Sequence, residues 1–205
     1  LLEALHATGK PVVLVLINGQ PLTINWADRN IPSILEAWFP GQLGGEAIAQ
    51  TLFGDYNPGG RLSVTFPRSI GQIEFNFPFK PGSQDGQYFA GPNGSGNTRV
   101  NGALYPFGHG LSYTTFAYSN LSVKQETPYS ESPVTVTVDV TNTGKRAGDE
   151  VVQLYIRDKV SSVIAYESVL RGFERISLQP GETKTVSFVL LPEDLQILDR
   201  HMEWT

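Results

Sequence analysis

Two different patterns of hydrophobic and polar positions divide the chain. In the first half, apolar residues form short continuous runs, as in Pro11 to Ile17, which reads P-V-V-L-V-L-I. In the second half they alternate with polar residues, as from Val134 to Val140. A continuous run is typical of a strand buried on both faces, whereas strict alternation is typical of a strand with one buried face. The pattern therefore predicts two domains of different class.

The first half predicts alternating helices and strands. Leu1 to His6 is expected to be helical, Pro11 to Ile17 to be a buried strand, and Ile34 to Phe39 to be a second strand. Gly44 to Phe53 has apolar residues at helical spacing, and Gly54 can end that helix because glycine accepts the left-handed conformation. Alternation of this kind favours the α/β class, with a mostly parallel sheet covered by helices.

The second half predicts a β-sandwich. Alternating runs at Val134 to Val140, Val152 to Ile156 and Val186 to Leu190 are separated by turn residues at Asn142 to Lys145 and Gln179 to Glu182. The chain has no cysteine, and this half has no central tryptophan, which excludes an antibody-type core. A fibronectin-III-like sandwich is the better interpretation.

Both ends of the sequence look cut. Leu1 has no capping residue before it, and about half of an ordinary doubly wound sheet is missing from the first domain. Thr205 ends where at least one more strand is expected. The predicted fold class is therefore α/β: a partial α/β sandwich at residues 1–116, followed by a truncated fibronectin-III-like domain at residues 117–205.

Composition excludes several classes of function. The 205 residues carry a net charge of −5, whereas a nucleic-acid partner favours a basic surface. The absence of cysteine excludes disulfides and thiolate metal sites. No apolar run is long enough to cross a membrane, and no metal-ligand spacing or nucleotide-binding glycine motif is present. We therefore expect no cofactor, no metal, no nucleic acid and no membrane span.

One long polar stretch is the best candidate for a functional loop. Lys80 to Gly102 contains 23 residues and six glycines. Loops of this length are often functional. Tyr88, Phe89 and Arg99 offer stacking and hydrogen-bonding groups, so this stretch is either a contact to a substrate or another subunit, with these three residues making it, or a plain surface loop.

A resemblance to a known family rests on five motifs in a fixed order. They are Gly9 to Leu16 (G-K-P-V-V-L-V-L), Ala37 to Gly41 (A-W-F-P-G), Leu52 to Leu62 (L-F-G-D-Y-N-P-G-G-R-L), Leu104 to Tyr113 (L-Y-P-F-G-H-G-L-S-Y), and Leu170 to Phe173 with Leu178 to Glu182. Together they resemble the C-terminal half of family 3 glycoside hydrolases, and of periplasmic-type β-glucosidases in particular. The resemblance covers nearly the whole chain.

The resemblance implies a retaining, exo-acting β-glycosidase with a barrel domain in cis, acting on β-linked oligosaccharides in the periplasm or outside the cell. Retaining hydrolysis needs two carboxyl groups about 5 Å apart. In the family, both lie upstream of the block that matches Gly9 to Leu16. No catalytic residue is therefore carried over, and the chain alone is expected to be inactive.

The other conspicuous residues have structural interpretations. Glu46 is expected to favour the positive end of a helix dipole, and Asp55 and Arg61 to tie the turn between them. His109 and Trp38 are expected to be packed, and Asp139, Asp149 and Glu150 to be solvated on the sandwich.

Two alternatives to a β-glucosidase remain: a β-xylosidase of the same family, and a stand-alone carbohydrate-binding or structural module. An incomplete sheet exposes an apolar face or a strand edge, so the chain is also expected to be able to form a homodimer.

Overall fold

The fold is described from a computed structural model, which describes residues 1–72, 76–80, 102–125 and 132–205. The chain forms two compact units. The α/β unit comprises Leu1–Tyr56, Leu62–Phe77 and Gln84–His109, and the sandwich unit comprises Asn57–Arg61, Pro78–Ser83 and Gly110–Thr205.

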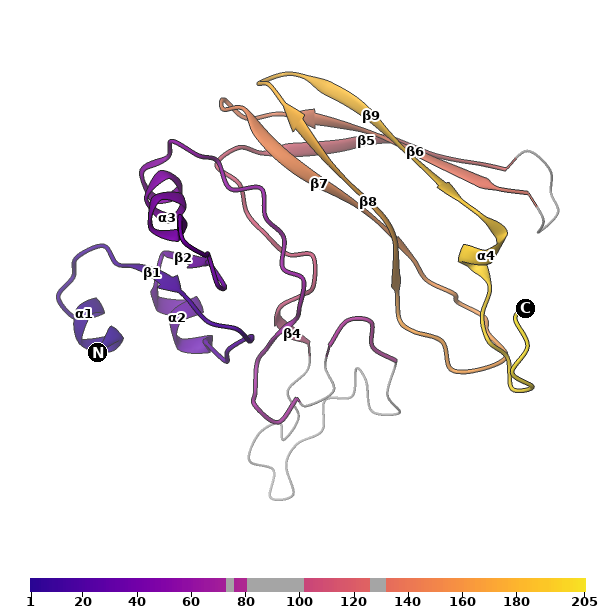
Figure 1. The fold of residues 1–205 in the computed structure, drawn as a ribbon, viewed down its shortest axis with the longest axis horizontal. Coiled ribbons are helices and arrows are strands. Elements are labelled where there is room, and N and C mark those ends of the chain that lie inside the picture. Colours follow the sequence, from indigo (N-terminus) through magenta and orange to yellow (C-terminus); the bar gives the residue numbers. More distant parts are fainter. Residues whose placement is uncertain (73–75, 81–101, 126–131) are drawn as a thin grey trace. The chain divides into compact units, whose positions relative to one another are not determined.

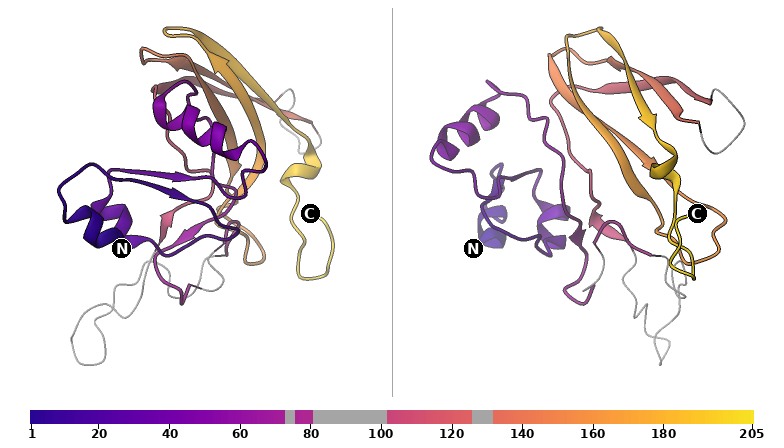
Figure 2. Two further views of the ribbon diagram at one scale, coloured as in Figure 1. Left: turned by 60° about the vertical axis from the view of Figure 1, so that its left-hand side comes forward. Right: turned by 45° about the vertical axis from the view of Figure 1, so that its right-hand side comes forward.

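The α/β unit begins with the predicted order of helices and strands. Its first elements are α1 (Leu2–His6), β1 (Val13–Leu16), α2 (Asn25–Asn30), β2 (Ser33–Glu36) and α3 (Gly44–Phe53). Strands β1 and β2 run parallel and side by side (Figure 2), in a register from Val13 opposite Ser33 to Leu16 opposite Glu36. Helix α3 has the predicted bounds, and Gly54 after it adopts the left-handed conformation with a φ of 83°.

The prediction that the first strand is buried on both faces is wrong for the described chain. Neither β1 nor β2 contains a buried residue, and Val13 is 49% exposed. Burial on both faces requires layers packed above and below the strand. In the described residues β1 pairs only with β2, and α1 contains no buried residue.

A short antiparallel pair also belongs to the described part of the α/β unit. Strand β3 (Phe66–Pro67) pairs with β4 (Ala103–Tyr105). The ring of Phe66, which is almost fully buried, lies 5.9 Å from the rings of both Trp38 and Tyr105. Trp38 is thus packed, as predicted.

Two facing sheets form the sandwich unit (Figure 1). One has the order β5-β6-β9 and the other pairs β7 with β8, all antiparallel. The strands are β5 (Phe116–Gln125), β6 (Val134–Asn142), β7 (Gly148–Ile156), β8 (Val169–Leu178) and β9 (Thr183–Leu190), followed by the short helix α4 (Pro192–Leu195).

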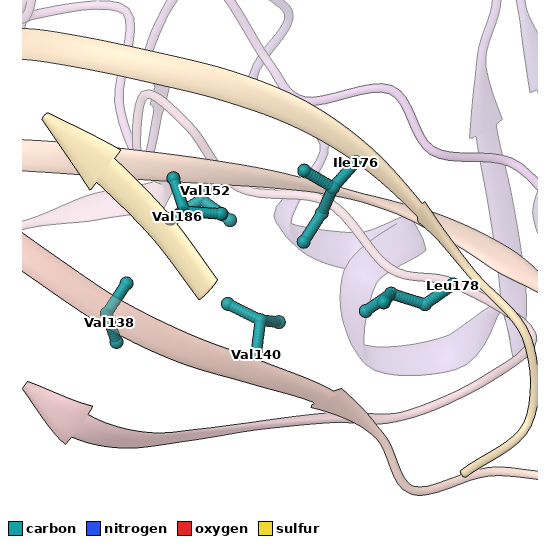
Figure 3. Packing of buried hydrophobic residues seen from close by; sticks show 6 residues of the cluster. All are labelled: Val138, Val140, Val152, Ile176, Leu178 and Val186. Atoms are coloured by element: carbon teal, nitrogen blue, oxygen red, sulfur yellow. The ribbon is translucent and has the colours of Figure 1, made fainter. Parts of the chain in front are cut away.

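The alternating valines form the core between these sheets (Figure 3). The core contains six buried residues from four strands: Val138, Val140, Val152, Ile176, Leu178 and Val186. The ring of Phe188 packs against the α-carbon of Gly172, where an added Cβ would lie 2.7 Å from a ring carbon. Period-two alternation therefore placed the inward residues correctly.

A buried amide closes one end of the sandwich core. Asn142 is fully buried, and its amide donates hydrogen bonds to the carbonyls of Arg146 (2.8 Å) and Leu178 (3.0 Å). Its side-chain oxygen accepts hydrogen bonds from the hydroxyl of Thr114 (2.7 Å) and the backbone N–H of Gly144 (3.0 Å). With these partners, burial of the amide carries no unsatisfied polar group.

Candidate functional site

The 57–61 segment, N-P-G-G-R, is a structural part of the sandwich unit. The amide of Asn57 donates to the carbonyl of Ala147 (2.9 Å). Its oxygen accepts from the hydroxyl of Ser112 (2.9 Å) and the backbone N–H of Tyr113 (2.8 Å). Asn57 therefore links the 112–113 segment to Ala147, and both are distant from it in sequence. An amide can do this because it carries both a donor and an acceptor.

Arg61 forms a buried ion pair with a partner that sequence reasoning missed. Its guanidinium lies 2.5 Å from the carboxylate of Glu150, and both side chains are 11% exposed. The hydroxyl of Tyr118 donates to the other carboxylate oxygen at 2.8 Å. Burial, followed by the Glu150 carboxylate, raises the pKa of Tyr118. Arg61 also donates to the carbonyls of Gly59 (3.3 Å) and Gly60 (3.0 Å), so it ties its turn as expected, while its charge is paired with Glu150 on β7.

The expectation that the sandwich carboxylates are solvated is wrong for Glu150. Glu150 is buried in this ion pair. Asp149 accepts hydrogen bonds from Ser177 (2.6 Å) and from Nε of Arg175 (2.8 Å), and these two partners hold its pKa below its ordinary value. Asp139 accepts from Asn120 (2.8 Å) and Thr185 (2.5 Å), which lowers its pKa as well. Asp139 and Asp149 thus remain at the surface, as expected, and neighbouring strands add polar partners that the sequence does not reveal.

A second aromatic and acidic cluster lies in the α/β unit. The hydroxyl of Tyr105 donates to Asp28 at 2.6 Å, and burial followed by this hydrogen bond raises the pKa of Tyr105. The His109 imidazole stacks on the Tyr105 ring, with 5.2 Å between centroids and 12° between planes. His109 is therefore packed, as expected.

The carboxyl ends of β1 and β2 bring together residues that sequence reasoning did not combine. Asn18, two residues after β1, donates to both oxygens of Glu36, the last residue of β2, at 3.3 and 3.4 Å. Glu36 also accepts the backbone N–H of Trp38 at 3.0 Å. The ring of Phe39 lies against Gly19 and is 78% exposed. We call Asn18, Gly19, Glu36 and Phe39 the carboxyl-edge patch.

A usable signal for this patch was present in the sequence. In open α/β sheets, ligands bind outside the carboxyl ends of the strands. Asn18 and Glu36 each lie at the carboxyl end of a predicted strand, or within one, so their proximity could have been inferred.

The residues predicted to contact substrate, Tyr88, Phe89 and Arg99, lie outside the described residues. Glu46 lies in the first turn of α3, as expected, and accepts a hydrogen bond from Gln50 at 3.0 Å. Across the described ranges, no group of three or more His, Asp or Glu side chains is placed to hold a metal ion. No helix among those residues has the length and apolarity that a membrane span requires.

Comparison with protein families gives the chain its class. Residues 1–113 match the glycosyl hydrolase family 3 C-terminal domain, and residues 150–205 match a fibronectin type III-like domain. The chain belongs to glycosyl hydrolase family 3. The resemblance seen in the motifs is thereby confirmed.

Curated relatives extend the match along nearly the whole chain. A β-xylosidase from Formosa agariphila is 50% identical over 99% of this chain, and a periplasmic β-glucosidase from Salmonella typhimurium is 46% identical over 100% of it. The chain spans 27% of the length of each of these two relatives.

Solved structures also match nearly the whole chain. A β-glucosidase from Erythrobacter marinus matches with a TM-score of 0.89 and 42% identity, over 100% of this chain and 26% of that one. A mutant β-glucosidase from Listeria innocua in complex with laminaribiose matches with a TM-score of 0.87 and 34% identity, over 98% of this chain and 28% of that one.

Proposed function

We propose that this chain is the C-terminal part of a longer retaining, exo-acting β-glucosidase that removes terminal β-D-glucosyl residues from oligosaccharides. The observation that carries the proposal is the match of nearly the whole chain to just over a quarter of each of several enzymes named for this activity. The best alternative is a β-xylosidase, because the relative with 50% identity carries that name.

In this proposal the catalytic nucleophile and the acid/base are supplied by a barrel domain and an upstream segment. The carboxylates of the described residues support this division. The general acid of a glycosidase needs a raised pKa. The carboxyl groups with a displaced pKa, Asp139, Asp149 and Glu182, are all displaced downward by hydrogen-bond donors. The chain alone is therefore proposed to be inactive.

The remaining parts of the proposal concern organisation. Residues 1–116 would complete the α/β domain and residues 117–205 would form the fibronectin-III-like domain, with Tyr88, Phe89 and Arg99 contacting the β-linked oligosaccharide. The location would be periplasmic or extracellular, as the name of one relative supports.

Homodimer formation is proposed for the isolated chain because large apolar side chains are exposed on and before α3. Phe53 is 85% exposed and Leu43 is 71% exposed. Exposed apolar clusters favour association. Sedimentation that detects only a monomer at high concentration would contradict this part of the proposal.

The activity is tested with chromogenic β-glucoside and β-xyloside, using the 205-residue chain beside the full-length product of its gene. We expect the longer protein alone to release the chromophore, and the faster substrate to identify the sugar. Activity of the short chain would refute the upstream location of the carboxylates. Inactivity of both proteins on both substrates would refute the glycosidase.

A further inference from the structure

The carboxyl-edge patch combines a strained backbone with an exposed aromatic ring. Trp38 has a φ of 49°, in the left-handed region that bulky residues rarely adopt. Such strain costs on the order of 1–3 kcal/mol and tends to occur at functional sites. The left-handed backbone at Trp38 affects how the side chains of Trp38 and Phe39 are placed.

The left-handed residue separates two neighbouring aromatic side chains. Trp38 packs toward the buried ring of Phe66, with 5.9 Å between centroids, whereas Phe39 is exposed. One edge of the Phe39 ring lies close to Gly19, because a Cβ at position 19 would lie 2.7 Å from its Cε2 atom and 2.8 Å from its Cζ atom. Glycine at position 19 therefore allows the exposed ring to approach the turn that follows β1.

The polar side chains of the carboxyl-edge patch do not use all of their hydrogen-bonding positions. Glu36 accepts one hydrogen bond of 3.0 Å from Trp38 and only long ones of 3.3 and 3.4 Å from Asn18. A carboxylate has about four acceptor positions and an amide has two donor hydrogens. Both groups thus retain capacity for hydroxyl groups, and Asn18 directly precedes Gly19, which the Phe39 ring approaches.

We propose that Asn18, Glu36 and Phe39 bind a saccharide at the carboxyl edge of β1 and β2. Phe39 packs against the apolar face of a pyranose ring, while Asn18 and Glu36 form hydrogen bonds with its hydroxyl groups. The choice of a β-linked gluco- or xylo-saccharide as ligand rests on the proposed function. The location of the site rests on the geometry of the patch.

The test uses ligand-observed saturation-transfer NMR with the 205-residue chain and cellobiose or xylobiose. We expect transfer from the wild-type chain to the disaccharide. In Phe39→Ala the transfer is expected to be lost, and in Gly19→Ala it is expected to fall because the added methyl displaces the ring. Glu36→Gln is expected to weaken the apparent Kd about five- to tenfold, because a neutral acceptor forms weaker hydrogen bonds than a carboxylate.

Phe53→Ala is the matched control, since Phe53 is also a largely exposed phenylalanine of the same unit, at 85% against 78% for Phe39. It is expected to leave the transfer unchanged, and equal circular dichroism spectra would show that each variant is folded. Equal transfer in wild type and Phe39→Ala would overturn the proposal. So would the absence of transfer from the wild-type chain at about 50 mM disaccharide, where even weak sites are occupied.

The saturation-transfer assay tests the saccharide site and the hydrolysis assay tests the glycosidase, so either proposal can fail without the other. Transfer without hydrolysis by the full-length product would leave the saccharide site in place and refute the glycosidase. Hydrolysis by the full-length product, without transfer from the 205-residue chain to the disaccharide, would refute the saccharide site and leave the glycosidase in place.

Discussion

The two units bury their apolar residues in different ways. In the sandwich unit, alternating strands of one sheet face another sheet of the same chain, and six residues form a closed core. In the α/β unit, β1 and β2 are rich in apolar residues and yet contain no buried residue. A strand with one apolar face needs only one partner layer, whereas a continuously apolar strand needs two. Strand pattern thus indicates how much additional structure each strand requires.

The buried ion pair is expected to show the largest effect on the sandwich unit. Arg61→Met leaves the Glu150 carboxylate buried without its cation, and loss of one partner of a buried pair costs about 3–5 kcal/mol. Urea denaturation should measure this loss in the free energy of unfolding. The control is Arg175→Met, which removes the more exposed pair with Asp149 and should cost about 1 kcal/mol or less. Equal losses in the two variants would contradict the assigned difference in burial.

Truncation of a side chain in the sandwich core is expected to cause the next largest loss in the free energy of unfolding. Leu178→Ala removes a side chain that is almost fully buried between the sheets, and such truncations cost about 2–5 kcal/mol. Leu121→Ala on β5 is the control, because that side chain is 70% exposed and should change the free energy of unfolding by about 0.5 kcal/mol or less. A large effect at Leu121 would show that the core extends over β5.

Hydrogen exchange tests the comparison without mutation. Backbone amides of β6, which is paired on both sides, should exchange on the order of a hundredfold more slowly than those of β1, because opening free energies follow local burial and pairing. Mass spectrometry of deuterated peptides from each strand gives both rates. Equal protection of β1 and β6 would show that the α/β unit is as stable as the sandwich.

Acid titration gives the smallest expected effect. The Ser177 hydroxyl, followed by Arg175, holds the pKa of Asp149 below its ordinary value of 3.8. Its contribution to stability is therefore fully present above pH 3.8 and is lost as the pH falls through the lower folded value. As the pH falls, the free energy of unfolding should decline less in Asp149→Asn than in the wild type. The difference should be about 0.2–1 kcal/mol, because solvent screens the pair of Asp149 and Arg175.

The free energy of unfolding, measured between neutral pH and about pH 2.5, checks this prediction. Ser177→Ala should reproduce part of the change, since it removes the first of the two causes. A decline as steep in Asp149→Asn as in the wild type would contradict the role given to this carboxylate.

Local features of the fold could be predicted from sequence because their causes are local. Helix α3 and the left-handed Gly54 follow from helical spacing and from the absence of a Cβ. The inward valines of β6 follow from alternation. In contrast, Arg61 and Glu150 are 89 residues apart, and only the folded chain brings them together.

The candidate site was predictable only in part for the same reason. The order of β1 and β2 indicates where Asn18 and Glu36 meet. The inward Trp38 and outward Phe39 depend on a backbone conformation that no propensity predicts for a tryptophan. Strand β2 accordingly ends at Glu36, before the predicted end at Phe39.

The interleaving of the two units along the chain has a consequence for recombination. The sandwich unit takes in Asn57–Arg61, a short stretch encoded well before Gly110–Thr205, which make up most of the unit. A gene exchange that transferred only residues after 116 would deliver a sandwich lacking Asn57, which binds Ala147, and Arg61, which neutralises Glu150. The sequence after residue 116 therefore does not contain every residue on which the sandwich unit depends. Exchange of this unit between relatives requires that the N-P-G-G-R segment be exchanged with it.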